Sequence, residues 1–196
     1  HEATAIFRNN VVAHNRAMGR SDAGGVYNEF FSSPTIENNW IVGNEGDDDG
    51  GGIYTMREGD PLIRHNLIAG NWTTMGGVGG VRVSKEGRAQ IIGNHIVRNL
   101  SGGGLYLVDG YMIAKGNVIA DNQKGLGIRI QQHYEYFQPA QISDNRILNN
   151  EEGAIKVMES VGPPPTMENN HIVEGRPSSS SQSFAIKKTT YDQSLG

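Results

Sequence analysis

Residues 63–71 read IRHNLIAGN, and residues 91–99 read IIGNHIVRN. Both follow the pattern apolar-x-x-Asn-x-Ile-x-x-Asn. Similar copies occupy residues 36–44, 114–122 and 142–150, and more divergent copies occupy residues 7–15 and 167–175. The first Asn of the seven copies is Asn10, Asn39, Asn66, Asn94, Asn117, Asn145 and Asn170. A block that recurs every 23–29 residues indicates a repeat protein in which each repeat forms one structural unit.

A second block lies between these copies and begins with a Gly or an Ala. The apolar residues that follow it are Val26, Ile53, Val81, Leu105, Ile128, Ile155 and Ile186. Because apolar residues alternate with a period of two, the segments are strands rather than the helix pairs of other repeat proteins. Three short strands and three turns fit into each repeat. The pattern therefore predicts an all-β, single-stranded parallel β-helix of about seven coils.

Stacking of the coils has two consequences for the repeated residues. Each first Asn is expected to turn the chain in the left-handed region, which Asn tolerates, and its side-chain amide can bond to the equivalent amides above and below in an Asn ladder. The inward aliphatic residues of the second block are expected to form one column. A second column is expected from Val12, Ile41, Ile68, Ile96, Ile119, Ile147 and Ile172.

The composition limits the organisation of the chain. The net charge of −4 argues against nucleic acid as the main partner, no apolar run is long enough to span a membrane, and the absence of Cys excludes disulfides. We expect the β-helix to cover residues 1–188 and a polar C-terminal tail to cover residues 189–196. No amphipathic helix caps the first coil, so we expect either further domains or end-to-end contacts there.

The alternation of G-G-[IV]-x with I-x-x-N-x-I-x-x-N resembles the right-handed parallel β-helix repeats of pectate-lyase-like, carbohydrate-active proteins. The resemblance covers about residues 6–188. It implies a secreted or cell-surface protein with a substrate cleft on the outer face of the sheet formed by the second block. The family includes lyases, hydrolases, epimerases, tailspikes and adhesins, so the activity has to be inferred from the site itself.

One outward residue follows each inward aliphatic of the second block, because side chains alternate across a strand. These residues, here named the stripe, are Tyr27, Tyr54, Arg82, Tyr106, Arg129, Lys156 and Lys187. Coils about 4.8 Å apart would place the residues in one line. Tyr rings can stack on sugar rings and Arg can bind a carboxylate, so the stripe predicts binding of an acidic polysaccharide.

Cleavage by β-elimination requires a group that neutralises a uronate carboxylate and a base that removes the C5 proton. Arg129 and Lys156 are candidates for these roles, and Lys156 is the better base because Arg holds its proton more tightly. The resemblance implies Arg or Lys bases, although no full family motif is present. His133, within the aromatic segment GIRIQQHYEYF, is a candidate general acid or base.

The acidic turn Asp47-Asp48-Asp49 is a candidate calcium site, since clustered carboxylates suit Ca²⁺ and many of the resembling lyases use it. The same residues could serve an inverting hydrolase as acid and base. However, the N-T-D and G-H-G segments of the resembling polygalacturonase-type hydrolases are absent. The residues leave open whether the protein is an enzyme. The main alternative is a non-catalytic polysaccharide-binding or structural module, such as an adhesin, stalk or fibre segment.

Overall fold

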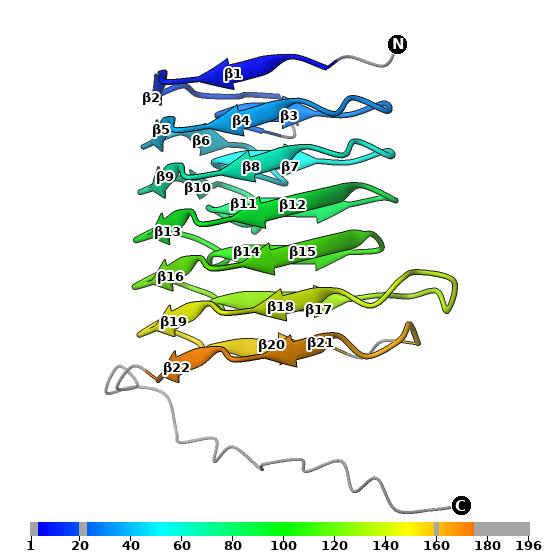
Figure 1. The fold of residues 1–196 in the computed structure, drawn as a ribbon. Helices are drawn as coiled ribbons and strands as arrows, with labels where there is room; N and C mark the ends of the chain where they lie inside the picture. The colour runs from blue at the N-terminus through cyan, green and yellow to red at the C-terminus, as the bar shows by residue number, and fades with distance from the viewer. Residues whose placement is uncertain (1–3, 20–22, 159–160, 175–196) are drawn as a thin grey trace, which may run out of the picture.

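The chain winds into a stack of flat turns that runs from β1 to β22 (Figure 1). The structure is a computed structural model that describes residues 4–19, 23–158 and 161–174. Six turns each contribute a strand to three parallel sheets, and two strands of a seventh turn complete the described part. The predicted all-β parallel β-helix with an Asn ladder is confirmed. Within the described residues no helix has the length and apolar character needed to cross a bilayer.

Three long sheets run along the stack. Sheet 1 consists of β1 (Ile6–Arg8), β4 (Thr35–Glu37), β8 (Leu62–Arg64), β12 (Arg88–Ile92), β15 (Tyr111–Lys115), β18 (Gln141–Ser143) and β21 (Thr166–Glu168). Sheet 2 consists of β2 (Val11–Ala13), β5 (Trp40–Val42), β9 (Leu67–Ala69), β13 (His95–Val97), β16 (Val118–Ala120), β19 (Arg146–Leu148) and β22 (His171–Val173). Sheet 3 consists of β3 (Val26–Asn28), β7 (Ile53–Thr55), β11 (Val81–Ser84), β14 (Leu105–Val108), β17 (Ile128–Gln131) and β20 (Ile155–Val157). A fourth, short sheet pairs β6 (Glu45–Gly46) with β10 (Trp72–Thr73).

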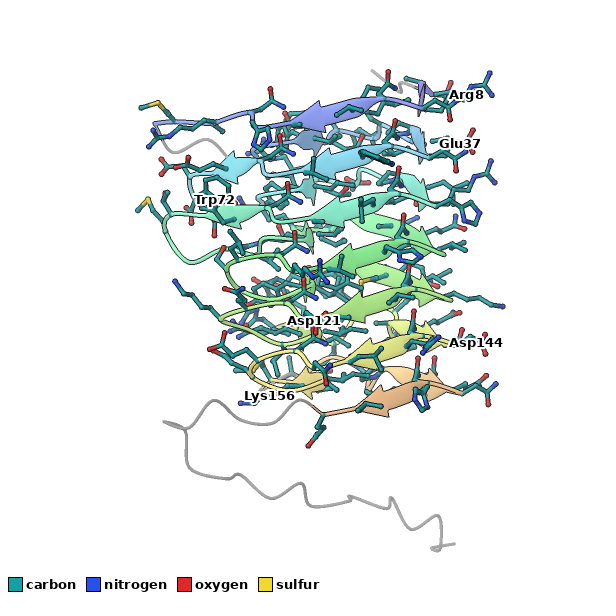
Figure 2. All side chains as sticks on the ribbon, turned by 90° about the vertical axis from the view of Figure 1, so that its left-hand side faces the viewer. Arg8, Glu37, Trp72, Asp121, Asp144 and Lys156 are labelled. Carbon is teal, nitrogen blue, oxygen red and sulfur yellow. The ribbon has the colours of Figure 1, made fainter. Side chains whose placement is uncertain are left out.

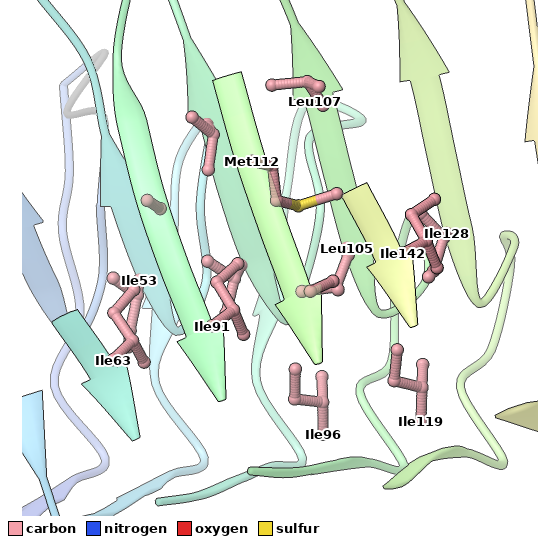
Figure 3. Packing of buried hydrophobic residues seen from close by; sticks show 14 of the residues in the cluster. Ile53, Ile63, Ile91, Ile96, Leu105, Leu107, Met112, Ile119, Ile128 and Ile142 are labelled. Atoms are coloured by element: carbon pink, nitrogen blue, oxygen red, sulfur yellow. The ribbon is translucent and has the colours of Figure 1, made fainter. Parts of the chain in front are cut away.

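Aliphatic side chains fill the interior of the stack in files that follow its axis, which runs across Figure 3 from left to right. Strand register pairs Ile53 with Val81 and Val81 with Leu105 in sheet 3, and Ile68 with Ile96 in sheet 2. The two predicted columns are confirmed over their described members. Sheet 1 adds a third file, which contains Ile36, Ile63, Ile91, Ala114 and Ile142.

Two Asn ladders hold the corners on either side of sheet 2. In the first ladder, Asn66 Oδ1 accepts from the backbone N–H and the side-chain amide of Asn39, and the Asn66 side-chain amide donates to Asn94 Oδ1. The second ladder runs through Asn15, Asn44, Asn71, Asn99, Asn122 and Asn150. One sequence expectation was wrong: the residue before each first-ladder Asn, not that Asn, has the positive φ. These residues are Asn9, Asn38, His65, Gly93, Gly116, Asp144 and Asn169.

The spacing between the two ladders is constant. In each of the first six turns, the second-ladder Asn follows the first-ladder Asn by five residues, as in Asn10 and Asn15 or Asn94 and Asn99. Equivalent residues at this corner therefore lie one above another, as Arg8 and Glu37 do in Figure 2. Differences in repeat length arise in the connections that flank sheet 3. The predicted end of the β-helix at residue 188 and the tail 189–196 lie outside the described residues.

Candidate binding face on sheet 3

The stripe forms one continuous file on the outer side of sheet 3. Register pairs Tyr27 with Tyr54, Tyr54 with Arg82, Arg82 with Tyr106, Tyr106 with Arg129, and Arg129 with Lys156. The predicted vertical alignment is therefore confirmed for six residues. The seventh, Lys187, lies outside the described residues.

The upper half of the stripe is closed by contacts among its own side chains. Tyr54 is fully buried, its ring centroid lies 5.6 Å from that of Tyr27, and its hydroxyl lies 2.7 Å from Ser84 Oγ. The Arg82 guanidinium lies 5.7 Å from the Tyr54 ring centroid and 2.6 Å from Asp49 Oδ1. Tyr54 therefore occupies its predicted position but has no surface for a ligand, and the charge of Arg82 is already balanced.

The lower half of the stripe opens into a hollow of about 490 Å³. We name this the cationic hollow; its lining includes Lys124, Arg129, Lys156, Glu152, Thr73, Thr74 and Ser101. The Arg129 guanidinium lies 4.4 Å from the Tyr106 ring centroid, while its buried Nε has no hydrogen-bond partner. Lys156 is exposed on the last complete turn, on the opposite flank from Asp144 (Figure 2). Three cations, one carboxylate and several hydroxyls thus line one open depression.

Comparison with known families agrees with this architecture. A profile described as a right-handed β-helix region matches residues 70–189, which is more than half of the chain. The chain belongs to the right-handed β-helix family. Neither the curated proteins nor the solved structures contain a significant match to it. The matched segment includes Arg129 and Lys156 and carries the fold, while the chemistry of this β-helix has to be inferred from its side chains.

The structure brings two of the three predicted catalytic residues of this β-helix together. Arg129 and Lys156 are paired on neighbouring strands and line the same hollow. His133 lies four residues beyond Arg129, which is about 13 Å along an extended chain. Its Nδ1 lies 2.9 Å from Asp109 Oδ2, and its backbone N–H donates to Asp109 Oδ1 at 2.7 Å. His133 thus belongs to the opposite edge of sheet 3.

The acidic turn of the β-helix has structural contacts. Asp49 binds Arg82, Asp47 Oδ1 accepts from Thr74 Oγ1 at 2.7 Å, and Asp48 is exposed. Across the described ranges, no three Asp, Glu or His side chains are grouped so that they could hold a metal ion. Asp47 and Asp49 are therefore engaged by protein side chains, and a calcium site at this turn stays a prediction.

Two features of the binding face were missed at the sequence level. Lys124 was not singled out, because it lies in a connection whose length differs between repeats and has no counterpart in the pattern. Asp109 was missed for the same reason, although it fixes His133. The only signal available for Lys124 was its position two residues after the ladder residue Asn122, on the approach to sheet 3.

Proposed function

We propose that this β-helix binds an acidic polysaccharide in the cationic hollow, with Lys124, Arg129 and Lys156 as its anion-binding groups. The observation that carries the proposal is the convergence of these three cations in one hollow of a protein whose net charge is −4. Local positive charge on an acidic protein attracts an anionic polymer to that face.

The spacing of the cations supports the choice of a polymer as the ligand. Arg129 and Lys156 lie on neighbouring strands, which are about 4.8 Å apart, and Arg129 is supported by the Tyr106 ring. This distance is close to the advance of one pyranose unit along a chain. The hydroxyls of Thr73 and Ser101, which lie 3.2 Å from each other, also line the hollow and add hydrogen-bonding groups.

Cleavage by β-elimination is the second candidate function, favoured by the pairing of Arg129 with Lys156. A Lys that acts as a base near neutral pH usually needs desolvation or a neighbouring cation to lower its pKa. Arg129 could supply the neighbouring charge, but Lys156 is exposed to solvent. Exposure favours binding over cleavage, so we place retention of the polymer first.

Affinity electrophoresis through gels that contain polygalacturonate or alginate tests the proposal. We expect the β-helix to be retarded, and the double variant Lys124→Ala/Lys156→Ala to lose most of the retardation. The matched control Lys115→Ala/Arg146→Ala removes the same charge from sheets 1 and 2 and should retain it. Equal retardation of both variants, or none for the parent, would refute the proposal. Ultraviolet absorbance from unsaturated ends, measured with the same polymers, decides whether elimination also occurs.

A further inference from the structure

A row of strained turns lies at the other edge of sheet 3. Three successive turns have pairs of residues with positive φ: Phe30 and Phe31 at 52° and 59°, Arg57 and Glu58 at 49° and 60°, and Lys85 and Glu86 at 50° and 66°. Backbone bonds close two of them, from Gly59 N–H to Met56 O at 3.0 Å and from Gly87 N–H to Ser84 O at 2.9 Å. Two-residue turns of this shape normally contain Asn and Gly.

The bulky residues in these turns are unfavourable for the backbone. Side chains with a Cβ are strained at positive φ, and strain that persists is often found at functional sites. Here the same strain recurs on three stacked turns, and it holds the side chains of Phe30, Arg57 and Lys85 outward in register.

With the loop that follows β17, the strained turns line a second hollow of about 550 Å³. Aromatic rings line it at both ends: the exposed Phe30 and Phe31 after the first turn of the β-helix, and the exposed Tyr134 and Tyr136 with the half-buried Phe137 after the fifth. The Tyr134 and Tyr136 rings are stacked with centroids 5.4 Å apart, and the Tyr136 and Phe137 centroids are 4.6 Å apart. We name this the aromatic hollow. Exposed apolar groups gathered around a depression mark a binding site.

The charges between the rings differ from those of the cationic hollow. The lining contains three carboxylates, Glu58, Glu86 and Asp109, and two cations, Arg57 and Lys85. Arg57 is already bound to Glu29 at 3.0 Å. Desolvation, followed by the charge of the Glu86 carboxylate, raises the pKa of the Tyr136 phenol, and both side chains line this hollow. A surplus of carboxylates opposes an acidic polymer but can accept hydrogen bonds from hydroxyl groups.

We propose that the aromatic hollow is a second carbohydrate site, which binds uncharged sugar units by stacking them on Phe30, Phe31 and Tyr136 while its carboxylates accept their hydroxyls. Aromatic rings provide flat apolar faces, and the apolar face of a pyranose fits against such a surface. This inference does not depend on the cationic hollow, which lies at the opposite edge of sheet 3 and has the opposite charge balance. The two hollows would give the protein one site for acidic units and one for uncharged units.

The turn geometry allows the rings to be removed by variants that should still fold, so that a loss of binding can be assigned to the rings. Phe30→Asn/Phe31→Gly removes two rings but gives the turn the residues that its backbone prefers, so the melting temperature should be unchanged or higher. Tyr136→Ala removes a ring that is 68% exposed and should also leave folding intact. Trp40→Ala, which removes a 60% exposed ring from sheet 2, is the matched control.

Binding is measured by calorimetry and saturation-transfer NMR with cellohexaose, mannohexaose, xylohexaose and laminarihexaose. We expect at least one hexasaccharide to bind, both ring-removing variants to weaken it about tenfold or more, and Trp40→Ala to bind normally. The variant Lys124→Ala/Lys156→Ala should also bind the hexasaccharide normally, which separates this site from the cationic hollow. Absence of binding to all four probes would refute the proposal, as would binding that survives loss of the rings. Sedimentation that reveals self-association dependent on Phe31 would instead assign the aromatic hollow to a second copy of the chain.

Discussion

Removal of one side chain from the middle of the first Asn ladder should be far more damaging than the same change at its end. Asn94 is fully buried, and its Oδ1 accepts from the backbone N–H of Asn66 at 2.9 Å and from the Asn66 side-chain amide at 3.0 Å. Its Nδ2 donates to Ile63 O at 2.9 Å and to Asn117 Oδ1 at 3.1 Å. Asn94→Ala deletes these four contacts at once.

The magnitude follows from the partners left behind. The side-chain amide of Asn66 keeps a second acceptor, Ile36 O, and Asn117 Oδ1 keeps the backbone N–H of residue 94. The backbone N–H of Asn66 has only the deleted oxygen as its acceptor, and such a buried orphan costs about 1–3 kcal/mol. With about 1 kcal/mol for each of the other three bonds, we expect the free energy of unfolding to fall by about 4–6 kcal/mol.

The matched control is Asn10→Ala at the exposed start of the same ladder. Asn10 donates to Arg8 O at 2.8 Å and to Asn39 Oδ1 at 3.3 Å, in contact with water. Its loss should cost about 1 kcal/mol or less. Guanidinium denaturation followed by circular dichroism measures both variants, and hydrogen exchange reads the Asn66 amide directly. If Asn94→Ala cost no more than Asn10→Ala, or left exchange of that amide unchanged, the ladder would not be a main source of stability.

Three further changes test separate features. In Asn94→Asp we expect burial to raise the pKa of the new carboxyl. The destabilisation should then grow by about 1.4 kcal/mol per pH unit between the unfolded pKa near 3.9 and the raised folded pKa, and level off above it; denaturation at several pH values, relative to the parent, checks this. Lys85→Asn/Glu86→Gly relieves two positive-φ residues and should raise the free energy of unfolding by about 1 kcal/mol. At Gly103 an added Cβ would collide with a carbonyl of the next turn, whereas at Gly116 it meets nothing within 4 Å. Gly103→Ala should therefore lower the melting temperature much more than Gly116→Ala, and equal effects would contradict the packing.

The fold was predictable because its determinants repeat. The spacing that places Ile68, Ile96 and Ile119 in one file occurs seven times in the sequence. Once the register of one pair of coils is known, the register of the others follows. The same periodicity predicted the alignment of the stripe from Tyr27 to Lys156. It could not predict which residue of the corner turns the backbone, because Asn-Asn, His-Asn and Gly-Asn pairs all satisfy the pattern.

Two properties could not be predicted from the sequence: which residues of the stripe are buried, and which residues line the two hollows. Both properties depend on connections that do not repeat. Tyr54 is buried because the acidic turn brings Asp49 to Arg82 beside it. Lys124 reaches the cationic hollow from a connection with no equivalent in other turns. The aromatic character of the segment around Tyr136 was visible in the sequence, but its partnership with Phe30 and Phe31 requires the winding of the chain.

The molecule has two parts that differ in how constant their length is. We name sheets 1 and 2 with their corners the spine, because the two ladders there are always five residues apart, and we name sheet 3 with its connections the flank. The spine contains the amide ladders and two of the three aliphatic files. An inserted residue there would shift the strand register and so break both the ladders and the files. The flank, which carries both hollows, changes length from turn to turn while the spine stays in place. New loops grafted between residues 133 and 139 should therefore alter what the protein recognises while its unfolding transition stays where it was, which makes this solenoid a ready scaffold for engineered specificity.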